Sequence, residues 1–439
     1  MRVVMVFGTA FMALLYVLSN SFITPFVMGN HISAGVMAQG AFEAFENPEK
    51  KQPPAVLEFD FMSDKEPIYK NTMQANSALL HETLDALAEK HGAVGMSIAA
   101  FEHDRIVFRH TYGMQNIEEN IPTESKTKYR VASISKLVTS ALAMMLEDST
   151  GFSIDDDLSY LYPYMRNPYF ADEPVTTRHL ITHTSGLIDA RPYMDVAKHL
   201  RFPSLRAVSL APGMWLDRKP GTAYEYSNFG MGVVAGVIEA KTGERFYDYA
   251  KRVLFDPLSI DAGYSMHLIK NPHLVANIYN QSGQLTAEPG RWTNMDAVYA
   301  SIPVGEMYML GHGDLFISAE DLAVIGVILA GDGTYGGRRY ISQKALSQMN
   351  TTMFIDSNAG VARGLGTFAA TDIFKKGTVY GHQGNAYGMI SGMFYDPATK
   401  TGVVLLSNGC SLKTGEQWIY DINRDVMKEV WRYLVPLTA

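Results

Sequence analysis

Hydrophobic and polar positions change their spacing several times along the 439-residue chain. Apolar residues recur every three to four positions over 73–91, which predicts a helix. The apolar runs 94–101 and 106–113 flank a polar turn and predict a β-hairpin. A polar stretch, 116–129, then leads into a long apolar helix that begins near Ser133.

The middle of the chain has the pattern of short helices and irregular loops. Three consecutive aspartates, 155–157, follow a turn and favour the cap of a short helix over a metal site. Residues 212–232 are rich in Gly, Pro and Tyr and predict a loop before a small-residue helix at 231–241. Residues 258–310 have weak periodicity and many polar turns, as in segments that often carry substrate contacts.

The last third of the chain returns to regular elements. Its pattern predicts a helix at 315–329, a turn at 331–337, strands at 378–382, 389–396 and 402–407, and a closing amphipathic helix at 417–434. This order indicates an α/β (α+β) fold in which one mixed antiparallel sheet is flanked by helices. A mostly helical region, about 150–305, is inserted into it.

Residues 1–38 differ in composition from the rest of the chain. Arg2 is their only charge, and the apolar run 3–18 follows it. Such a segment is typical of a signal peptide or of an N-terminal membrane anchor, and we favour cleavage. The charge asymmetry predicts that the remainder lies outside the cytoplasm, periplasmic or secreted. Polar, proline-bearing residues 39–77 predict a linker to a folded domain at 78–434.

Charge and composition narrow the classes of partner. A net charge of −8 without a basic cluster argues against nucleic acid. One cysteine, Cys410, excludes an internal disulfide framework, and the scattered histidines indicate neither a metal nor a cofactor. His179 and His183 have the spacing of two ligands on one helical face, but no third ligand is near, which favours structural hydrogen bonding. A small-molecule or peptide substrate is the expected partner, and the oligomeric state stays open.

The candidate chemistry begins at Ser133-Ile134-Ser135-Lys136, where the apolar helix starts. Residues three apart share a helical face, so the Lys136 amine can reach the Ser133 hydroxyl. A buried lysine with a lowered pKa can activate an alcohol, and the helix N-terminus adds N–H groups and a positive dipole end. An ordinary amphipathic helix with Lys136 in solvent explains the same residues. A second Ser-x-x-Lys, 125–128, lies in a charged stretch without a following apolar helix.

Two further motifs lie where side chains can be presented to a site. Tyr226-Ser227-Asn228 lies in the Gly/Pro loop before a helix, whereas the Tyr-x-Asn at 69–71 lies in the linker. His382-Gln383-Gly384-Asn385 leads into the strand at 389–396. Three Lys-Thr-Gly sequences, which start at 241, 400 and 413, lie at a helix end, in a hairpin turn and before the last helix, so none of them opens a strand that could line a site.

Taken in this order, Ser133-x-x-Lys136, Tyr226-x-Asn228 and His382-x-Gly384 resemble the motifs of the class C β-lactamase and DD-peptidase family of serine hydrolases. That group also includes esterases and D-amino-acid peptidases. The segments 178–187, 226–230, 316–323 and 395–397 agree with the resemblance, which covers roughly residues 78–434. It implies a β-lactamase/transpeptidase-like fold and an acyl-enzyme formed on Ser133.

The resemblance also implies a role for each motif residue. Lys136 and Tyr226 would share the proton transfers, Tyr226 as a phenolate in one version, and which of them is the base stays open. The backbone N–H groups of Ser133 and Asn385 would form an oxyanion hole. Asn228 would bind the substrate amide, and His382 would orient or polarise the far end of the acyl partner, with Gly384 completing the third motif.

Two departures from the family pattern bear on the substrate. His382 stands where lactam-specialised and cell-wall enzymes more often have lysine, so a fixed cation for a substrate carboxylate is lost or becomes pH-dependent. Tyr387 follows where a run of small residues is more usual, and it either narrows the site or forms a stacking wall. We expect a hydrolase of an ester or a peptide-like amide, D-amino-acid peptides included. A β-lactamase and a slow-turnover penicillin-binding or sensor protein are the alternatives.

Overall fold

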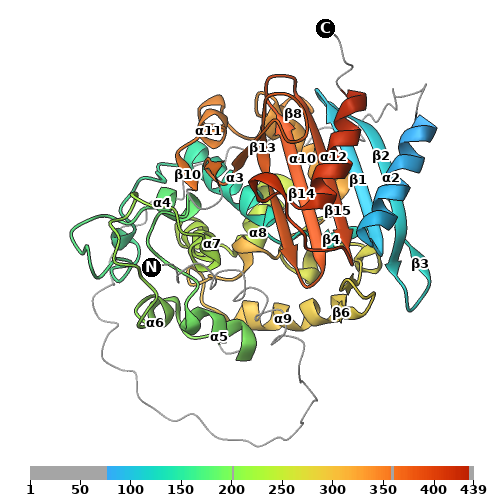
Figure 1. The fold of residues 1–439 in the computed structure, drawn as a ribbon. Coiled ribbons are helices and arrows are strands. Elements are labelled where there is room, and N and C mark those ends of the chain that lie inside the picture. The colour runs from blue at the N-terminus through green and yellow to red at the C-terminus, as the bar shows by residue number, and fades with distance from the viewer. Residues whose placement is uncertain (1–76, 200–201, 357–359, 435–439) are drawn as a thin grey trace, which may run out of the picture. The chain divides into compact units, whose positions relative to one another are not determined.

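An antiparallel sheet forms the centre of the structure, a computed structural model that describes residues 77–199, 202–356 and 360–434 (Figure 1). These residues belong to one unit of the chain, Pro67–Ala439. The predicted signal peptide or anchor at 1–38 lies outside the described residues, as does nearly all of the linker at 39–77. Both stay predictions.

The sheet takes its strands from the two ends of the described chain. The order across it is β10-β11-β12-β13-β14-β15-β1-β2-β3, and every adjacent pair is antiparallel. The strands are β1 (Gly95–Glu102), β2 (Arg105–Asn116), β3 (Ile121–Pro122), β10 (Phe354–Asp356), β11 (Val361–Arg363), β12 (Phe368–Thr371), β13 (Thr378–Ala386), β14 (Met389–Asp396) and β15 (Thr401–Asn408). The hairpin predicted at 94–113 and the strands predicted at 389–396 and 402–407 are confirmed, and the structure pairs β1 with β2 and β14 with β15.

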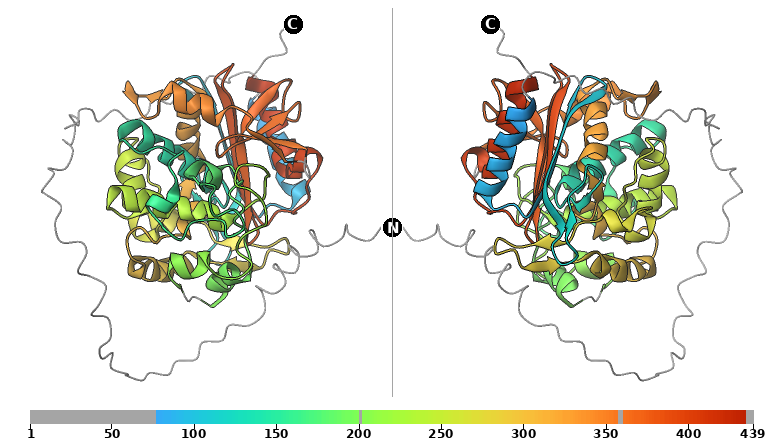
Figure 2. Two further views of the ribbon diagram at one scale, coloured as in Figure 1. Left: turned by 90° about the vertical axis from the view of Figure 1, so that its left-hand side faces the viewer. Right: turned by 90° about the vertical axis from the view of Figure 1, so that its right-hand side faces the viewer.

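Helices cover both faces of the sheet, as the edge-on views of Figure 2 show. Helices α2 (Ser77–His91) and α12 (Asp421–Leu434) lie on one face. Helices α3 (Ile134–Ser149) and α10 (Ala319–Ala330) lie on the other, between the sheet and the helical part of the chain. The strands therefore bury side chains on both faces.

The remaining helices range from single turns to α7, which is as long as α2. The helices are η1 (Leu158–Tyr160), α4 (Thr177–Ile181), α5 (Arg191–His199), α6 (Leu205–Ser209), α7 (Asn228–Thr242), α8 (Phe246–Ala250), η2 (Lys251–Phe255), η3 (Met266–Leu268), η4 (Pro272–Leu274), α9 (Pro289–Ser301), η5 (Leu310–His312), α11 (Gln343–Met349) and η6 (Glu416–Trp418). Three small pairs of strands complete the fold: β4 (Lys128–Arg130) with β7 (Phe316–Ser318), β5 (Ile278–Tyr279) with β6 (Leu285–Ala287), and β8 (Thr334–Tyr335) with β9 (Arg338–Arg339).

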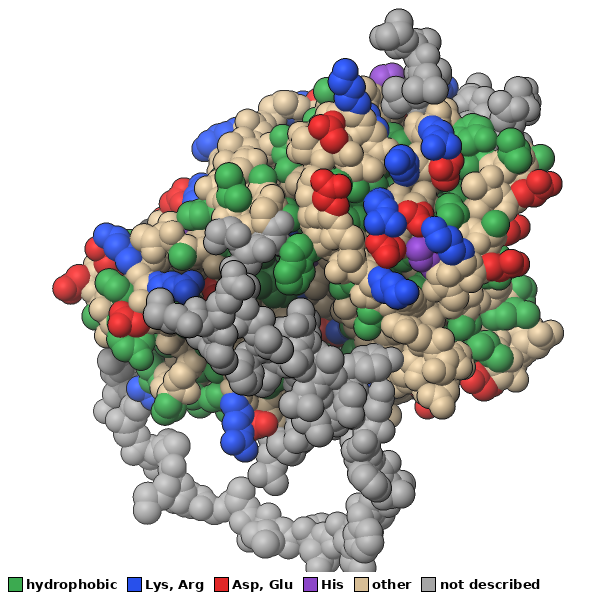
Figure 3. Space-filling model, viewed as in Figure 1, with side chains coloured by type: hydrophobic (Ala, Val, Ile, Leu, Met, Phe, Trp, Pro, Cys, Tyr) green, Lys and Arg blue, Asp and Glu red, His purple; other side chains and the backbone are tan. Residues whose placement is uncertain are grey.

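Strand β1 shows how the sheet separates two hydrophobic cores. Successive side chains of a strand point to opposite faces. Ala99 and Phe101 accordingly pack into the core shared with α3 and α10, whereas Ile98 and Ala100 pack into the core under α2 and α12. On the outer side of α2 and α12, Figure 3 shows charges of both signs interspersed, and Lys90 pairs there with Asp425 at 2.7 Å.

Several predicted element boundaries are wrong. The helix predicted at 315–329 begins only at Ala319, because 316–318 pair with β4 as β7 and Ser318 Oγ then accepts a hydrogen bond from the Asp321 N–H, which caps the helix. The closing helix begins at Asp421, since residues 417 and 418 have φ values of 52° and 59°, outside the right-handed helical region. The loop predicted at 212–232 ends earlier, where α7 starts.

Helix α9 is absent from the sequence prediction. It begins with Pro289, a residue favoured in the first helical turn. Of its residues only Trp292 and Tyr299 are buried, so the period of 3.6 that would reveal a helix is faint. Among the residues that the structure describes, none of the helices combines the length and the hydrophobicity needed to cross a bilayer.

Candidate active site

Ser133 lies at the junction between strand β4 and helix α3. Val131 and Ala132 lie between β4 and Ser133, and Ala132 has a φ of 48°, a left-handed conformation that non-glycine residues rarely adopt. Such strain is concentrated at functional sites. Ser133 is the N-cap residue of α3, as its position before the apolar run predicts. Its hydroxyl is therefore presented at the helix N-terminus.

Lys136 is the buried base candidate next to it. Its Nζ lies 3.0 Å from Ser133 Oγ, and it donates to Asn228 Oδ1 at 2.7 Å and to the His312 carbonyl oxygen at 2.7 Å. The residue is 1% exposed. Burial lowers the pKa of Lys136 to about 7, the Asp189 carboxylate opposes this shift, and the Arg130 charge adds to it. A large fraction of the amine is therefore neutral at pH 7 and can accept a proton.

Tyr226 is the second side chain in contact with the serine hydroxyl. Its hydroxyl donates to Ser133 Oγ at 2.8 Å, and its ring centroid lies 4.9 Å from Lys136 Nζ. Burial raises the pKa of the Tyr226 phenol, although the hydrogen bond with Ser133 opposes the shift. The phenol therefore keeps its proton at neutral pH. This favours Lys136 over a Tyr226 phenolate as the resting base.

Asp189 organises the Tyr-x-Asn motif, and nothing in its sequence context indicates it. Its Oδ2 accepts from Asn228 Nδ2 at 2.7 Å and from the Asn228 backbone N–H at 3.0 Å. Its Oδ1 accepts from the Phe229 N–H at 2.9 Å. The carboxylate thus caps the first turn of α7 and fixes the Asn228 amide, so that Oδ1 faces Lys136.

His183 contacts the loop that carries Tyr226 and Ser227. Its ring lies 4.5 Å from the ring of Tyr226, and its Nδ1 accepts from the Ser227 N–H at 3.2 Å. His179 caps α4 through a hydrogen bond from the Thr176 N–H. The prediction that both histidines make structural hydrogen bonds is therefore confirmed. The prediction that they share one helical face is wrong, because α4 ends at Ile181 and His183, with a φ of 57°, lies beyond the helix.

Strand β13 brings the third motif against the serine. Gly384 packs so closely that a Cβ there would lie 2.5 Å from the Ser133 backbone nitrogen. Gly384 lies within β13, which runs to Ala386, so the strand predicted at 378–382 is longer than expected. Strand β12 pairs with β13 only as far as Gly381, so among the described residues the edge beyond it has no partner strand.

The backbone of Asn385 faces this open edge. Ala386 and Met389 pair across a two-residue turn, and such a closing pair exchanges both of its hydrogen bonds. The next pair, Asn385 with Ile390, is then a non-hydrogen-bonded pair, so the Asn385 N–H points away from β14. The Asn385 side chain instead donates to the Tyr420 hydroxyl at 2.7 Å. The side-chain amide is thus bonded to Tyr420, whereas the backbone N–H is directed to the open edge.

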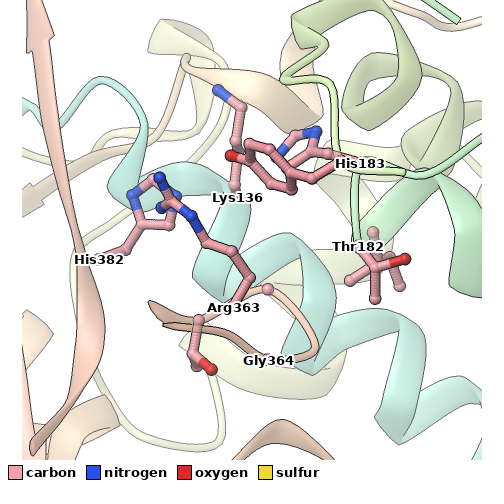
Figure 4. Close-up of a pocket in the computed structure, with 10 residues that line it drawn as sticks. Lys136, Thr182, His183, Arg363, Gly364 and His382 are labelled. Atoms are coloured by element: carbon pink, nitrogen blue, oxygen red, sulfur yellow. The ribbon is translucent and has the colours of Figure 1, made fainter. Parts of the chain in front are cut away.

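His382 lines a pocket together with Lys136, His183 and Arg363 (Figure 4). Its Nδ1 lies 2.6 Å from the Gln383 carbonyl oxygen, so the N–H is on Nδ1 and Nε2 is an acceptor. Burial lowers the pKa of His382 to about 3, and the Lys136 charge adds to this shift. The imidazole is therefore neutral at physiological pH.

The other expected residues lie elsewhere or outside the described residues. Lys128, the lysine of the second Ser-x-x-Lys, lies in β4, and its side chain pairs with Asp261 at 3.0 Å. The Tyr-x-Asn at 69–71 lies outside the described residues. Tyr387 packs against Trp292 of α9, with ring centroids 5.6 Å apart. In the residues that the structure describes, no group of three His, Cys, Asp or Glu side chains is arranged to hold a metal ion.

The comparisons with known proteins agree with this geometry. The beta-lactamase family model matches residues 80–421, so the chain belongs to the beta-lactamase family, a group of serine hydrolases. It is 28% identical to penicillin-binding protein 4* of Bacillus subtilis over 186 residues, and this aligned region covers 42% of this chain and 40% of that protein. It is 27% identical over 193 residues to a D-aminopeptidase of Gluconobacter oxydans, 42% of this chain and 35% of that protein.

Solved structures share the fold. A penicillin-binding protein homologue from Pyrococcus abyssi, described as octameric, has a TM-score of 0.65 at 20% identity, over 82% of this chain and 77% of that one. The hydrolase EstCE1 has a TM-score of 0.63 at 20% identity, over 81% and 98%. The expected β-lactamase/transpeptidase-like fold is thus confirmed. The chain spans less than half the length of both curated relatives named above.

Proposed function

We propose that this protein is an extracytoplasmic serine hydrolase that cleaves an ester or a peptide-like amide through an acyl-enzyme on Ser133. The observation that carries the proposal is the double contact of Ser133 Oγ, 3.0 Å from Lys136 Nζ and 2.8 Å from the Tyr226 hydroxyl. An alcohol needs an adjacent base to become a nucleophile. The N-terminal segment 1–38, with its apolar run and single charge, supports the location.

In the acylation step, neutral Lys136 takes the proton of Ser133 while Oγ bonds to the substrate carbonyl carbon. The developing oxyanion lies between the N–H of Ser133 and the N–H of Asn385, which the open edge of β13 supplies. The bond to the leaving group breaks, and the proton passes from Lys136 through the Tyr226 hydroxyl to the leaving oxygen or nitrogen. Water then releases the acyl group by the reverse proton path.

The amide class we favour is a peptide with a D-configured residue. The support is the similarity to a D-aminopeptidase and, at 26% identity over 178 residues, to a D-alanyl-D-alanine-carboxypeptidase/endopeptidase of Escherichia coli. Esters belong to the proposal because EstCE1, a hydrolase with acyltransferase activity, has the same fold. A neutral His382 does not itself offer a cation to a lactam carboxylate, and a β-lactamase stays the alternative.

The test is pre-steady-state hydrolysis of a chromogenic aryl ester. We expect a burst of about one equivalent or less, followed by a linear steady rate, and Ser133→Ala should abolish both. Ser125→Ala, in the second Ser-x-x-Lys, is the matched control and should keep the wild-type rate. A stoichiometric burst without a steady rate would contradict the hydrolase and support the slow-turnover alternative. Loss of activity in Ser125→Ala but not in Ser133→Ala would overturn the assignment of the nucleophile.

A further inference from the structure

Arg130, the last residue of β4, forms a buried ion pair with Asp314. Its Nε and its Nη2 both donate to Asp314 Oδ1, at 2.9 Å and 2.8 Å. Each of the two side chains is 7% exposed. The desolvation of two buried charges offsets most of their attraction, so such a pair contributes little net stability. Its position in the chain indicates a different role.

The ion pair connects the segment of the nucleophile with the segment that holds the base. Arg130 precedes Ser133 by three residues, and Asp314 follows His312 by two. The His312 carbonyl oxygen accepts a hydrogen bond from Lys136 Nζ at 2.7 Å. A movement of Asp314 would therefore change the distance between this carbonyl oxygen and the Lys136 amine.

Arg130 also contacts aromatic side chains next to the third motif. Its guanidinium carbon lies 4.7 Å from the ring centroid of Trp292 and 5.5 Å from that of Tyr387. A guanidinium over an aromatic ring is attracted by the negative face of the ring. Tyr387 follows Asn385 by two residues, in the turn between β13 and β14. Arg130 thus contacts, directly or through Asp314, the segments next to the nucleophile, the base and the predicted oxyanion hole.

The pair places two opposite charges near the Lys136 amine. Burial is the main cause of the lowered pKa of Lys136, and the Asp189 carboxylate opposes it. The Arg130 charge adds to the lowering of this pKa, whereas the Asp314 carboxylate opposes it. The two members of the pair therefore act on the amine with opposite signs, and their effects offset each other while both are ionised.

Other titratable groups face Lys136 from the remaining elements. Arg363 of β11 lines the pocket beside the amine, and its guanidinium is always charged (Figure 4). Burial raises the pKa of the Tyr226 phenol and lowers the pKa of three histidines near the amine, which are His183, His312 and His382. The phenol and the imidazoles are therefore neutral at pH 7. The ionised groups among these neighbours are Asp189, Arg130, Asp314 and Arg363.

We infer that Arg130 and Asp314 are a positioning pair for Lys136. The pair holds the His312 carbonyl against the amine, and its opposite charges offset each other there. Neither residue needs to touch the substrate in this role, because both act through Lys136. The inference rests on the proposed function, since it needs Lys136 to be the base that activates Ser133. It adds two residues that lie outside the three sequence motifs.

The test is the pH profile of kcat/KM for a neutral aryl ester. Asp314→Asn removes the carboxylate charge but keeps an oxygen that can accept from Arg130, which stays charged. The uncompensated cation disfavours the protonated amine, so the pKa of Lys136 should fall by about one unit. The ratio of kcat/KM at pH 8 to that at pH 6 should then drop from about tenfold in the wild type to about twofold.

Two further variants separate the charge effect from a loss of structure. The double variant Arg130→Met/Asp314→Asn removes both charges and should return the ratio to about tenfold, while kcat/KM itself falls because the carbonyl is no longer held. Asp261→Asn is the matched control, since Asp261 pairs at 3.0 Å with Lys128, a buried cation of the same strand. It should keep the wild-type ratio.

The ratio decides between a positioning pair and a merely structural one. If folded Asp314→Asn keeps the tenfold ratio and loses kcat/KM equally at both pH values, the inference is overturned and the hydrolase stands. If Asp314→Asn does not fold, Arg130→Met gives the test with the opposite sign: the remaining carboxylate should raise the ratio above tenfold, and a ratio of tenfold or less overturns the inference. If the wild type hydrolyses no ester, the proposed function fails and the inference fails with it.

Discussion

Replacement of Gly384 by alanine probes how closely β13 approaches Ser133, the proposed nucleophile. The new Cβ would lie 2.5 Å from the Ser133 nitrogen, 2.9 Å from the Val131 carbonyl oxygen and 2.9 Å from Ser391 Oγ. Contacts of a Cβ below 3.0 Å are essentially never found, and two of these three atoms belong to the backbone. The strand and the serine must therefore move apart by about 0.5 Å or more, the difference between these two distances.

This displacement has a larger effect on activity than on stability. Overpacking of a well-packed site costs about 1–3 kcal/mol of unfolding free energy. Removal of one oxyanion-hole donor lowers kcat by roughly 10²–10³, and the displacement moves the Ser133 N–H relative to the Asn385 N–H. We therefore expect Gly384→Ala to remain folded and to lose about two orders of magnitude or more in kcat/KM.

The assay pairs the kcat/KM for a neutral aryl ester with a thermal melt followed by circular dichroism. Gly290→Ala is the control, because nothing lies within 4 Å of a Cβ at that position in α9. It should keep the wild-type rate. Wild-type kcat/KM in folded Gly384→Ala would refute the close approach of β13 to Ser133 and the oxyanion hole built on it.

Three further predictions concern the groups around the serine. Burial lowers the pKa of Lys136 to about 7, and only the neutral amine accepts a proton. The kcat/KM for a neutral ester should therefore rise roughly tenfold from pH 6 to pH 8 and then level off. A flat pH profile would contradict Lys136 as the base. Tyr226→Phe removes the hydroxyl that bonds Ser133 Oγ and should lower kcat by about 10²–10⁴ with little change in melting temperature, whereas an unchanged kcat would exclude the phenol from the proton path. Asp189→Ala removes two hydrogen bonds to the first turn of α7 and the support of the Asn228 side chain, whereas the N-cap Ser227 remains. We expect a stability loss of about 1–2 kcal/mol together with a lower kcat/KM; wild-type values of both would show that the carboxylate positions nothing.

The spacing of apolar residues was enough to predict the helices and strands whose side chains alternate regularly between buried and exposed positions. Alternating and periodic apolar positions predicted the β1–β2 and β14–β15 hairpins and the long helix behind Ser133. The Ser-x-x-Lys spacing placed the Lys136 amine within hydrogen-bonding distance of Ser133, because three residues make nearly one helical turn. Ser125 and Lys128 have the same spacing, and only the absence of a following helix distinguished them.

Long-range contacts account for what the sequence did not indicate. Asp189 and Arg363 come from separate segments of the chain, and neither lies in a motif that the sequence analysis singles out. His183 is singled out there, but its contact with the ring of Tyr226 is not predicted. The role of Asn385 was predicted from a motif, yet only the pairing register of β13 shows that its N–H faces an open edge. Helix α9 buries too few residues to leave a periodic pattern.

The central claim is that Ser133 is the residue acylated by substrate, and the most direct measurement is the location of a covalent adduct. The protein is treated with a fluorophosphonate or with a fluorescent penicillin, digested, and the modified peptide is identified by mass spectrometry. The account predicts one adduct, on the peptide that contains Ser133, which is lost in Ser133→Ala and retained in Ser125→Ala. An adduct on any other residue that persists in Ser133→Ala would contradict it.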